Sequence, residues 1–413
     1  MPHSPVTREA SLSAFSDRAP LSAAWAWLDA RPAPSAREMV PLAACAGRVL
    51  AEPVIINGEK SRRPRAVLNG YAVRSSDCDG AGAYNPLMLR LLEQGAAALA
   101  FATASPIVSG WSLPSGADAV LPLEAAQLAD AGTLEVLAPV PPGTGIDRAD
   151  WRDGTAVLDQ GRRIGPLEVA CLATLGIEHV AVSRRPRVAI VVPGAKSGPD
   201  ALTPMLSALL DRDGALAGAI PVLGAGERAL AAALSASRSG FDVVLIAGRG
   251  GAGPDDFAPL ALQLAGGNLA LHGLALCPGD ASGLGTLPGD GTGLVPVVLL
   301  PGDPPACLAA YDMLAARLVR RLPGSATVLP YAVAEFELER KIVSVISVVE
   351  VVPVRLTAGR AVPIGAGGGL PRAACADGFV IVPETSEGYP EAARVGVHLY
   401  NTTRMEGSPD MRS

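Results

Sequence analysis

Three apolar segments, each ending in a glycine-rich turn, constrain the fold of this chain more than any other feature. They occupy residues 242–248, 269–276 and 295–300. Apolar runs of this length, bounded by glycine and proline, are typical of buried parallel strands, and such sheets bind ligands at the carboxyl ends of their strands. We therefore expect the three turns to converge on one ligand-binding crevice.

Helical and extended patterns alternate around these segments. A further strand is predicted at 188–192, with helices at 203–211, 227–237 and 306–321. Strands that alternate with helices of about ten residues are typical of a doubly wound sheet. We therefore predict an α/β multidomain protein whose central domain is a doubly wound, mostly parallel sheet.

The rest of the chain predicts three further domains. Helix formers favour helices at 21–30, 43–52 and 165–175, short apolar runs at 106–124 favour a small β-rich domain, and alternating β-branched residues beyond residue 323 favour an all-β domain. The predicted domains are an N-terminal helical and extended domain at 1–56 and 145–183, an inserted β-rich domain at 57–144, an α/β domain at 184–325, a C-terminal β domain at 326–400 and a disordered tail at 401–413.

Composition excludes several classes of protein. The formal net charge of −6 argues against a general nucleic-acid binder, which needs a basic face. No run reaches the roughly 18 apolar residues that span a bilayer. The six cysteines form no Cys-x-x-Cys pair and the four histidines are widely separated, which favours free thiols over a sequence-local zinc site. We predict a soluble cytoplasmic protein with neither a nucleic-acid nor a membrane partner.

Several stretches of the chain, taken in order, resemble one family. They lie at 66–74, 109–110, 114–124, 161–192, 242–256, 272–285 and 300–306. From about residue 21 to residue 400, the chain resembles the molybdopterin molybdenumtransferase family, which includes MoeA and the E domain of gephyrin. The resemblance implies an α/β domain that binds molybdopterin, a homodimer whose cleft is completed by the second subunit, and insertion of molybdate into molybdopterin-AMP with Mg²⁺.

The resemblance also assigns candidate site residues. The family's Gly-Gly-Val-Ser-Val-Gly turn corresponds to Gly248, Arg249, Gly250, Gly251, Ala252 and Gly253. Backbone N–H groups of such a turn can hold a phosphate, to which Arg249 adds charge. Further binding positions are Pro301 and Gly302, in the family's Pro-Gly-Asn-Pro turn, and Ser109 and Gly110, in its Thr-Gly pair. Asp256 and Asp303 are the candidate ligands of Mg²⁺ or molybdate, and together with Asn69 they are the candidate catalytic residues.

The chain departs from the family where the family carries charge or a hydroxyl. The motif Met-Asp-Gly-Tyr-Ala has Asn69 in place of its aspartate, and an amide binds Mg²⁺ less well and cannot act as a base. The other departures are Ala195 and Lys196 in place of two acidic residues, Gly251 in place of a serine, and Cys277 and Asp280 in place of two lysines.

Each candidate also has a purely structural interpretation. Asp118, Asp256 and Asp303 are equally compatible with capping helices or bonding turn amides. Cys277 has no identifiable base, which favours a small buried residue over a nucleophile, and alternation along one strand would put His272 on the opposite face from it. Three arginines of one loop fit a solvated loop or a phosphate-facing cluster: Arg62, Arg63 and Arg65.

Two hypotheses of different class remain. The first is a Mg²⁺-dependent molybdopterin molybdotransferase of the family type. The second is a paralogue that binds molybdopterin, or a molybdoenzyme or other protein of the cofactor pathway, without completing the transfer, because chemistry on a polyanion depends on the missing charges. A third, an unrelated nucleotide-binding α/β protein, would not explain the serial order of the motifs. We predict a molybdenum cofactor biosynthesis protein with impaired or altered insertion, and whether it is an enzyme stays open.

Overall fold

The computed structural model describes residues 18–31, 36–56, 64–147, 154–194, 199–289, 293–365 and 369–401. The chain forms two compact units. The first unit comprises residues 1–52, 160–166 and 179–413, and the second unit comprises residues 53–159 and 167–178. In the described part of the chain, no helix has the length and apolar character needed to cross a membrane.

A six-stranded sheet forms the centre of the first unit, in the order β14-β13-β15-β19-β18-β16. Its strands are β13 (Arg187–Val191), β14 (Leu216–Ile220), β15 (Val243–Ala247), β16 (Asn268–His272), β18 (Gly283–Pro288) and β19 (Leu294–Leu300). β13, β14, β15 and β19 are parallel, and β18 is antiparallel to both of its neighbours. Consequently, β16 runs in the same direction as β19. The strands predicted at 188–192, 242–248 and 295–300 are confirmed, and β14 and β18 are two that the sequence pattern did not reveal.

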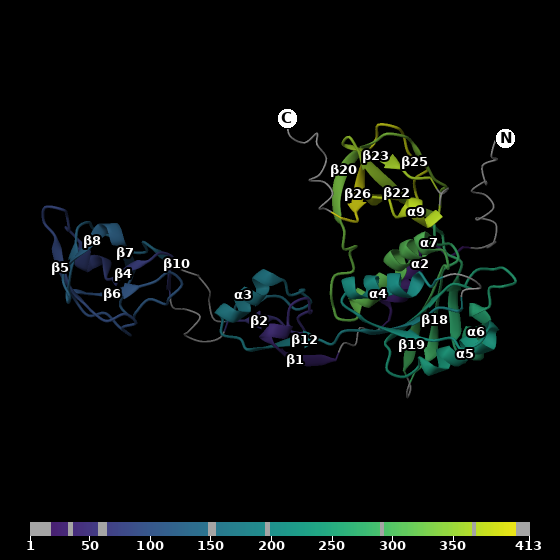
Figure 1. The fold of residues 1–413 in the computed structure, drawn as a ribbon, viewed down its shortest axis with the longest axis horizontal. Coiled ribbons are helices and arrows are strands. Elements are labelled where there is room, and N and C mark those ends of the chain that lie inside the picture. The colour runs from purple at the N-terminus through teal and green to yellow at the C-terminus, as the bar shows by residue number, and fades with distance from the viewer. Residues whose placement is uncertain are drawn as a thin grey trace. The chain divides into compact units, whose positions relative to one another are not determined.

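Helices cover both faces of this sheet, as a doubly wound fold requires (Figure 1). Alternate strand residues face opposite ways, so Leu245 and Ile246 of β15 belong to different cores. One face packs against α2 (Leu21–Asp29), α4 (Leu202–Arg212), α7 (Pro304–Ala310) and α8 (Ala316–Arg321), and the other packs against α5 (Gly226–Ala236) and α6 (Ala258–Leu264). The helices predicted at 21–30, 203–211 and 227–237 are confirmed.

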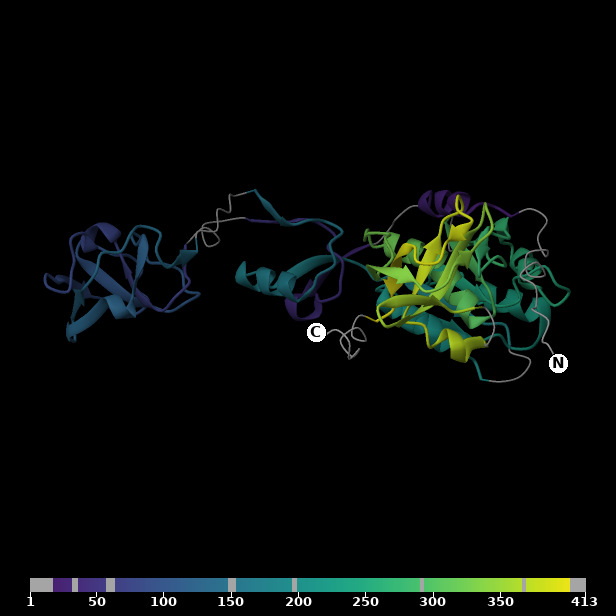
Figure 2. The same ribbon diagram turned by 90° about the horizontal axis from the view of Figure 1, so that it is seen from above.

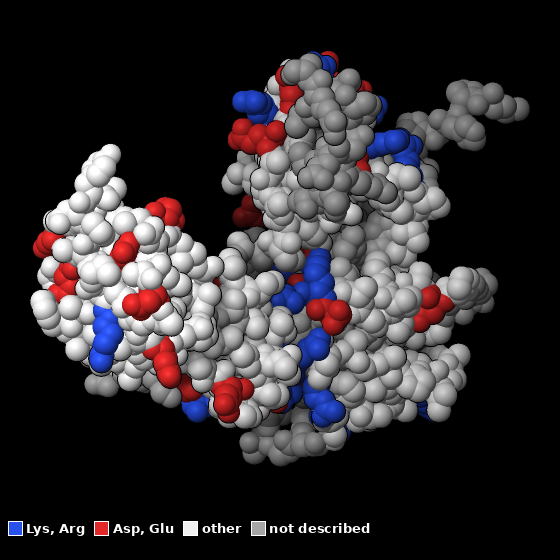
Figure 3. All heavy atoms as spheres, turned by 60° about the vertical axis from the view of Figure 1, so that its left-hand side comes forward, with Lys and Arg blue, Asp and Glu red and all other residues white. Residues whose placement is uncertain are grey.

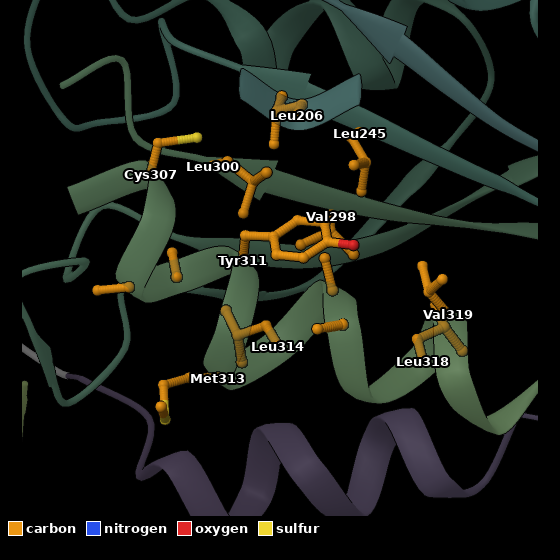
Figure 4. Packing of buried hydrophobic residues seen from close by; sticks show 14 of the residues in the cluster. Leu206, Leu245, Val298, Leu300, Cys307, Tyr311, Met313, Leu314, Leu318 and Val319 are labelled. Carbon is orange, nitrogen blue, oxygen red and sulfur yellow. The ribbon is translucent and has the colours of Figure 1, made fainter. Parts of the chain in front are cut away.

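The predicted helix at 306–321 contains a π-helical turn, η5 (Tyr311–Ala315), between α7 and α8. Figure 4 shows the ring of Tyr311 on the side of this helix that faces the strand residues Val298 and Leu300. Tyr311 is fully buried, and its hydroxyl donates to Oδ2 of Asp213 at 3.0 Å. The wider turn therefore lies at a point where a large polar side chain enters the core, as π-helical turns often do at special positions.

The second sheet of the first unit closes into a ring. Its order is β17-β22-β23-β20-β26-β24, and an additional pairing of β22 with β24 completes the closure. The strands are β17 (Leu276–Cys277), β20 (Ala332–Leu338), β22 (Val349–Thr357), β23 (Arg360–Pro363), β24 (Gly378–Val382) and β26 (Arg394–Leu399). A separate pair is formed by β21 (Ile342–Val343) and β25 (Gly388–Tyr389).

The predicted C-terminal β domain is confirmed, with one short helix, α9 (Gly369–Ala373), among its strands. One prediction for this region is wrong. The apolar run at 269–276 is not one strand, because Gly273 has a positive φ of 79° and the chain turns there. Residues before the turn pair in the α/β sheet as β16, and residues after it pair with β22 in the ring as β17.

A short antiparallel pair, β1 (Arg37–Pro41) and β12 (His179–Ser183), completes the first unit. The helix predicted at 43–52 is wrong: only one 3₁₀ turn, η1 (Leu42–Ala44), forms there. Gly47 has a φ of 76°, and Val49 and Leu50 pair in bridges with Arg163 and Val182. The left-handed glycine stops the helix, and the bridges then hold the chain extended.

The second unit is built on a six-stranded sheet, drawn in blue in Figure 2. Its strands lie in the order β7-β4-β6-β5-β9-β8. Its strands are β4 (Gly70–Val73), β5 (Leu87–Leu91), β6 (Thr103–Ile107), β7 (Ala119–Pro122), β8 (Ala126–Asp130) and β9 (Thr133–Val136), with the 3₁₀ turns η3 (Ser75–Cys78) and η4 (Leu123–Ala125). It also contains helix α3 (Pro166–Thr174), which confirms the helix predicted at 165–175, and the strand pairs β2 (Val54–Ile55) with β11 (Ala156–Leu158) and β3 (Arg65–Ala66) with β10 (Ile146–Asp147).

Candidate functional site

The turns after β15 and β19 meet at the carboxyl edge of the α/β sheet. The N–H of Gly248 donates to the carbonyl of Leu300 at 2.9 Å. A Cβ at Gly302 would lie 3.3 Å from Cα of Gly248, and Gly248 itself has a φ of 96°. The two turns touch because both positions lack a side chain. Pro301 is buried beside them, whereas Gly302 is exposed.

The end of the third apolar strand also reaches these turns. His272, the last residue of β16, has Nε2 2.7 Å from the carbonyl oxygen of Gly250. A carbonyl only accepts, so Nε2 carries the proton and donates. This contact brings the end of β16 to the turn after β15, although the sequence predicted that the turn following residue 276 would be the third to converge there. The contact itself was missed, because the sequence pattern placed His272 and Cys277 on one strand; the available signal was a histidine ending an apolar run.

Asp256 bonds the turn in which it lies. Its Oδ2 accepts from the N–H of Gly253 at 2.9 Å, and its own N–H donates to the carbonyl of Gly253 at 3.0 Å. An ideal Cβ at Gly251 would lie only 2.5 Å from the same Oδ2. Gly251 stands where the family has a serine. Because it lacks a side chain, it leaves room for the carboxylate of Asp256 in the position where it accepts from Gly253.

Arg249 adopts a left-handed backbone, with a φ of 59°. This is the second position of the family's Gly-Gly motif, where glycine would adopt that conformation without strain. The guanidinium folds back over its own loop, with Nη1 3.9 Å from Oδ2 of Asp255 and Cζ 5.9 Å from the ring centroid of Phe257. The side chain is 22% exposed, so its charge lies beside the turn without pointing freely into solvent.

Asp303 caps the helix that follows β19. It is the N-cap of α7, and its Oδ2 accepts from the N–H of Ala306 at 3.2 Å. Pro304 and Pro305 occupy the first helical positions, where a missing N–H costs nothing. The residue as a whole is exposed.

The remaining sequence-predicted residues cluster in the second unit. The side-chain oxygen of Asn69 accepts from the N–H of Ser109 at 2.9 Å, and the N–H of Gly110 donates to the carbonyl of Ala66 at 2.7 Å. Arg65 donates from Nη1 to the carbonyl of Gly110 and from Nη2 to that of Thr174, both at 3.2 Å. Asn69, Ser109 and Gly110 therefore form one local group, braced by an arginine from the basic loop. Arg62 and Arg63 lie outside the described residues.

Other departures from the family have structural roles or lie outside the described residues. Asp280 faces Arg18, whose Nη2 is 3.4 Å from Oδ2, and burial raises the pKa of this carboxyl. Cys277 is partly buried in β17 and precedes Pro278 through a cis peptide bond. Asp118 accepts from both the N–H and the hydroxyl of Ser75, at 2.6 and 2.8 Å. Ala195 and Lys196 belong to a stretch that the structure does not describe.

The candidate acidic residues do not make a metal centre by themselves. Within the described ranges, no group of three or more His, Cys, Asp or Glu side chains gathers as a metal site. Oδ2 of Asp256 and Oδ2 of Asp303 each accept from a backbone N–H, and the oxygen of Asn69 does the same. Mg²⁺ needs near-octahedral oxygen ligands, so these side chains fit it poorly.

Comparison with known proteins gives two consecutive family matches. Residues 17–176 match the MoeA N-terminal region, described as domains I and II, and residues 175–321 match a probable molybdopterin binding domain. Molybdopterin molybdenumtransferase 2 of Mycobacterium tuberculosis is 29% identical over 300 residues, which cover 66% of this chain and 72% of that protein. The molybdopterin molybdenumtransferase of a Nostoc species is 27% identical over 308 residues, or 70% of each chain.

The fold comparison agrees. A crystal structure of a molybdopterin biosynthesis MoeA protein from Pyrococcus horikosii has a TM-score of 0.73 to this chain at 28% sequence identity. The similarity covers 93% of this chain and all of that one. The likeness therefore extends over both units, beyond the segments that the two family matches cover.

Proposed function

The chain belongs to the MoeA family of molybdenum cofactor biosynthesis proteins, and on that premise we propose that it binds molybdopterin, or its adenylated form, but inserts molybdate poorly. The binding part of this proposal rests on the turns after β15 and β19. The insertion part rests on the hydrogen bonds of three side chains.

Binding is supported by the open backbone of the glycine turn. Gly248 and Gly302 let two loops touch at the sheet edge, and Ala252 and Gly253 are exposed. N–H groups of a turn at the end of a parallel strand suit an anionic group such as a phosphate. The relatives named above are molybdopterin molybdenumtransferases, which makes a phosphate-bearing pterin the best-supported ligand.

Impaired insertion is carried by one observation: each candidate acidic or amide side chain accepts from a backbone N–H of its own neighbourhood. Asp256 bonds Gly253, Asp303 bonds Ala306 and Asn69 bonds Ser109. Transfer of an oxyanion to a polyanionic substrate needs charges that are oriented toward the reacting groups. A carboxylate oxygen that already accepts a backbone hydrogen bond is held toward that N–H and is less free to orient toward the reacting groups. Asn69 has no charge to contribute.

We further propose a homodimer in which the Asn69 group of one subunit faces the α/β turns of the other. Support comes from the family resemblance and from the separation of the candidate residues between the two units: Asn69, Ser109 and Gly110 lie in the second, whereas Gly248 to Gly253, Asp256 and Asp303 lie in the first.

The test is a defined assay with purified protein, adenylated molybdopterin, molybdate and Mg²⁺. Pterin binding is measured by equilibrium ultrafiltration, and product is measured by reactivation of a cofactor-free molybdoenzyme. We expect pterin binding with little or no product. Robust Mg²⁺-dependent product formation would establish the fully active transferase instead, and absence of pterin binding would refute the proposal.

Two matched variants separate capping from chemistry. Asp256→Asn and Asp303→Asn retain the oxygen that accepts the capping hydrogen bond but remove the charge. We expect each to bind the pterin within about twofold of wild type, because the turn geometry is retained. If the wild-type protein does form product, a tenfold or greater loss of product in either variant would assign the substituted carboxylate to catalysis.

A further inference from the structure

A small pocket in the first unit is lined by four arginines from separate parts of the chain. They are Arg48 after η1, Arg163 before α3, Arg185 before β13 and Arg320 in α8. The pocket also contains Ser183 and Asp213, and the space open to the centres of water-sized spheres is about 30 Å³. That space accommodates two waters or one small anion. None of these residues belongs to the turns described above.

One of the arginines is a buried cation with an unused donor. Arg320 is only 6% exposed, and its Nη1 donates to Oδ1 of Asp213 at 3.1 Å. Its Nε is buried and has no hydrogen-bond partner among the residues that the structure describes, and the same holds for Nε of Arg48. Buried donors that lack a partner are costly, and an anion held in the pocket beside these two guanidinium groups would offset part of that cost.

The single carboxylate of the lining does not neutralise the pocket. Both oxygens of Asp213 are occupied, since Oδ1 accepts from Arg320 and Arg212, and Oδ2 accepts from Arg212 and Tyr311. Arg212 also pairs with Asp312 at 2.7 Å. These two arginines and two aspartates therefore balance one another.

Of the other three arginines, two have carboxylate partners and Arg163 leaves an unbalanced positive charge. Arg48 pairs with Glu38, and Arg185 pairs at 3.1 Å with Asp211, whose side chain is 83% exposed and contributes little in solvent. Arg163 donates to the carbonyl of Arg212 at 2.9 Å and has no carboxylate partner in the described part of the chain. On the face drawn in Figure 3, Lys and Arg side chains lie in a strip with acidic side chains beside them, and most of the remaining described surface is uncharged.

From this arrangement we propose that the arginine pocket binds a tetrahedral oxyanion of the sulfate and molybdate class. Arginine donates and never accepts, and the lone pairs of Asp213 already receive hydrogen bonds, so the charged groups of the lining have donors to offer but no free acceptor, and the side-chain acceptors left are the hydroxyls of Ser183 and Ser325. Sulfate and molybdate accept through all four oxygens at neutral pH, whereas hydrogen phosphate carries an O–H that needs an acceptor. The fully deprotonated dianions therefore fit better than phosphate. The site stands independently of the proposed function, because it lies outside the pterin-binding turns.

The experiment is calorimetric titration of the full chain with sodium sulfate, sodium molybdate and sodium phosphate in a low-salt buffer. Sodium chloride at equal ionic strength is the reference. We expect one dianion per chain for sulfate and molybdate, with phosphate weaker by at least threefold. If neither sulfate nor molybdate binds above the chloride reference, the proposal is wrong. Tighter binding of molybdate than of sulfate would show that the pocket selects the ion that the family uses as a substrate. Equal binding of the two would show a general site for tetrahedral dianions.

Arg163→Gln is the diagnostic variant, because it removes the unpaired charge and leaves the buried network intact. Loss of one charge-assisted contact should weaken dianion binding about tenfold or more. The matched control is Arg360→Gln on β23, which removes an equal charge from an exposed ion pair with Glu337 of β20. Equal weakening by both variants, or no weakening by Arg163→Gln, would overturn the proposal.

A second variant keeps the test valid if Arg163→Gln does not fold. Arg163→Lys retains the charge but loses the planar fork, and it should bind with intermediate affinity. Pterin binding, measured by the ultrafiltration described above, should be unchanged in both Arg163 variants. Loss of dianion binding with retained pterin binding therefore separates this site from the proposed function.

Discussion

At the scale of single residues, the glycine turn stores backbone strain at one position. Arg249 has a φ of 59°, a conformation that costs a residue with a Cβ about 1 kcal/mol relative to glycine. Its guanidinium offsets part of this cost through its contacts with Asp255 and Phe257. Strain of this kind clusters at functional sites, which agrees with the turn as the ligand-binding element.

Arg249→Gly and Arg249→Ala separate strain from side-chain contact. Both variants lose the guanidinium, but only alanine keeps a Cβ in the left-handed region. We expect the glycine variant to be more stable than the alanine variant by about 1 kcal/mol. The check is thermal unfolding of the three proteins under one buffer condition. Equal stability of the two variants would show that the turn relaxes to another backbone conformation.

At the scale of elements, helix α2 is fastened to α8 by an ion pair. Nε and Nη2 of Arg317 donate to the two carboxylate oxygens of Asp29 at 2.9 and 2.7 Å, and Nη2 of Arg321 donates to the carbonyl of the same aspartate at 2.6 Å. The hydrogen bond from Arg317 lowers the pKa of Asp29. Trp25 adds a donor from α2 to the carbonyl of Met313, at 2.8 Å.

This pair gives a pH-dependent contribution to stability. Since the folded-state pKa of Asp29 is lowered, its contribution is fully present above the unfolded pKa of about 4 and is lost as the pH falls through the folded value. The side chain is 40% exposed, so Asp29→Asn should cost only about 0.5–1 kcal/mol at pH 7 and less at pH 3. Thermal unfolding at both pH values measures this. A deficit that persists undiminished at pH 3 would contradict the assignment.

At the scale of the whole molecule, the core of the first unit is assembled from distant parts of the chain. Leu21, Ala24 and Leu28 of α2 are fully buried in the same cluster as Leu245 of β15 and Phe379 of β24. Figure 4 shows Met313 on the side of its helix that faces α2. The domain boundaries predicted from the sequence stay predictions, because both the α/β sheet and the ring fall within one compact unit.

Removal of residues 1–31 should therefore destabilise the α/β sheet although none of its strands is deleted. Each fully buried leucine contributes about 1.5–3 kcal/mol, so loss of Leu21 and Leu28 alone costs roughly 3–6 kcal/mol. Soluble yield and thermal unfolding measure the effect. The control is removal of residues 402–413, which the sequence predicts to be a disordered tail. Unchanged stability in the N-terminal truncation would contradict the structural role of α2.

Local sequence patterns were enough to predict most elements of the doubly wound domain. They failed for elements whose structure depends on pairing with residues far away in the sequence. The strands at β13, β15 and β19 are continuous apolar runs, and their helices have regular spacing, so each is recognisable within its own window. β18 is rich in glycine and was not recognised, and the helix predicted at 43–52 gave way to bridges with Arg163 and Val182. The strand split at Gly273 depends on a pairing with β22, which lies more than 70 residues away.

In the candidate site, too, some features were predictable from local sequence and others were set by three-dimensional contacts. The residues of the two α/β turns were identified from the motif, and the turns do meet, because parallel strands end at one edge of a sheet. The hydrogen bond of His272 to Gly250 and the capping bonds of Asp256 and Asp303 were not determined by the motif. They depend on side-chain geometry, for which the sequence left structural and ligand-binding interpretations equally open.

The sequence by itself determined the family, the fold class, the edge of the sheet at which the glycine turns lie and the positions where family charges are replaced. These properties follow from residue order and local periodicity. Only the tertiary structure decided which oxygens already accept backbone hydrogen bonds and which arginines share a pocket. Arg48, Arg163, Arg185 and Arg320 are far apart in sequence and come together only when η1, β12 and α8 pack in one unit. Such proximity is a property of packing, which no local pattern encodes.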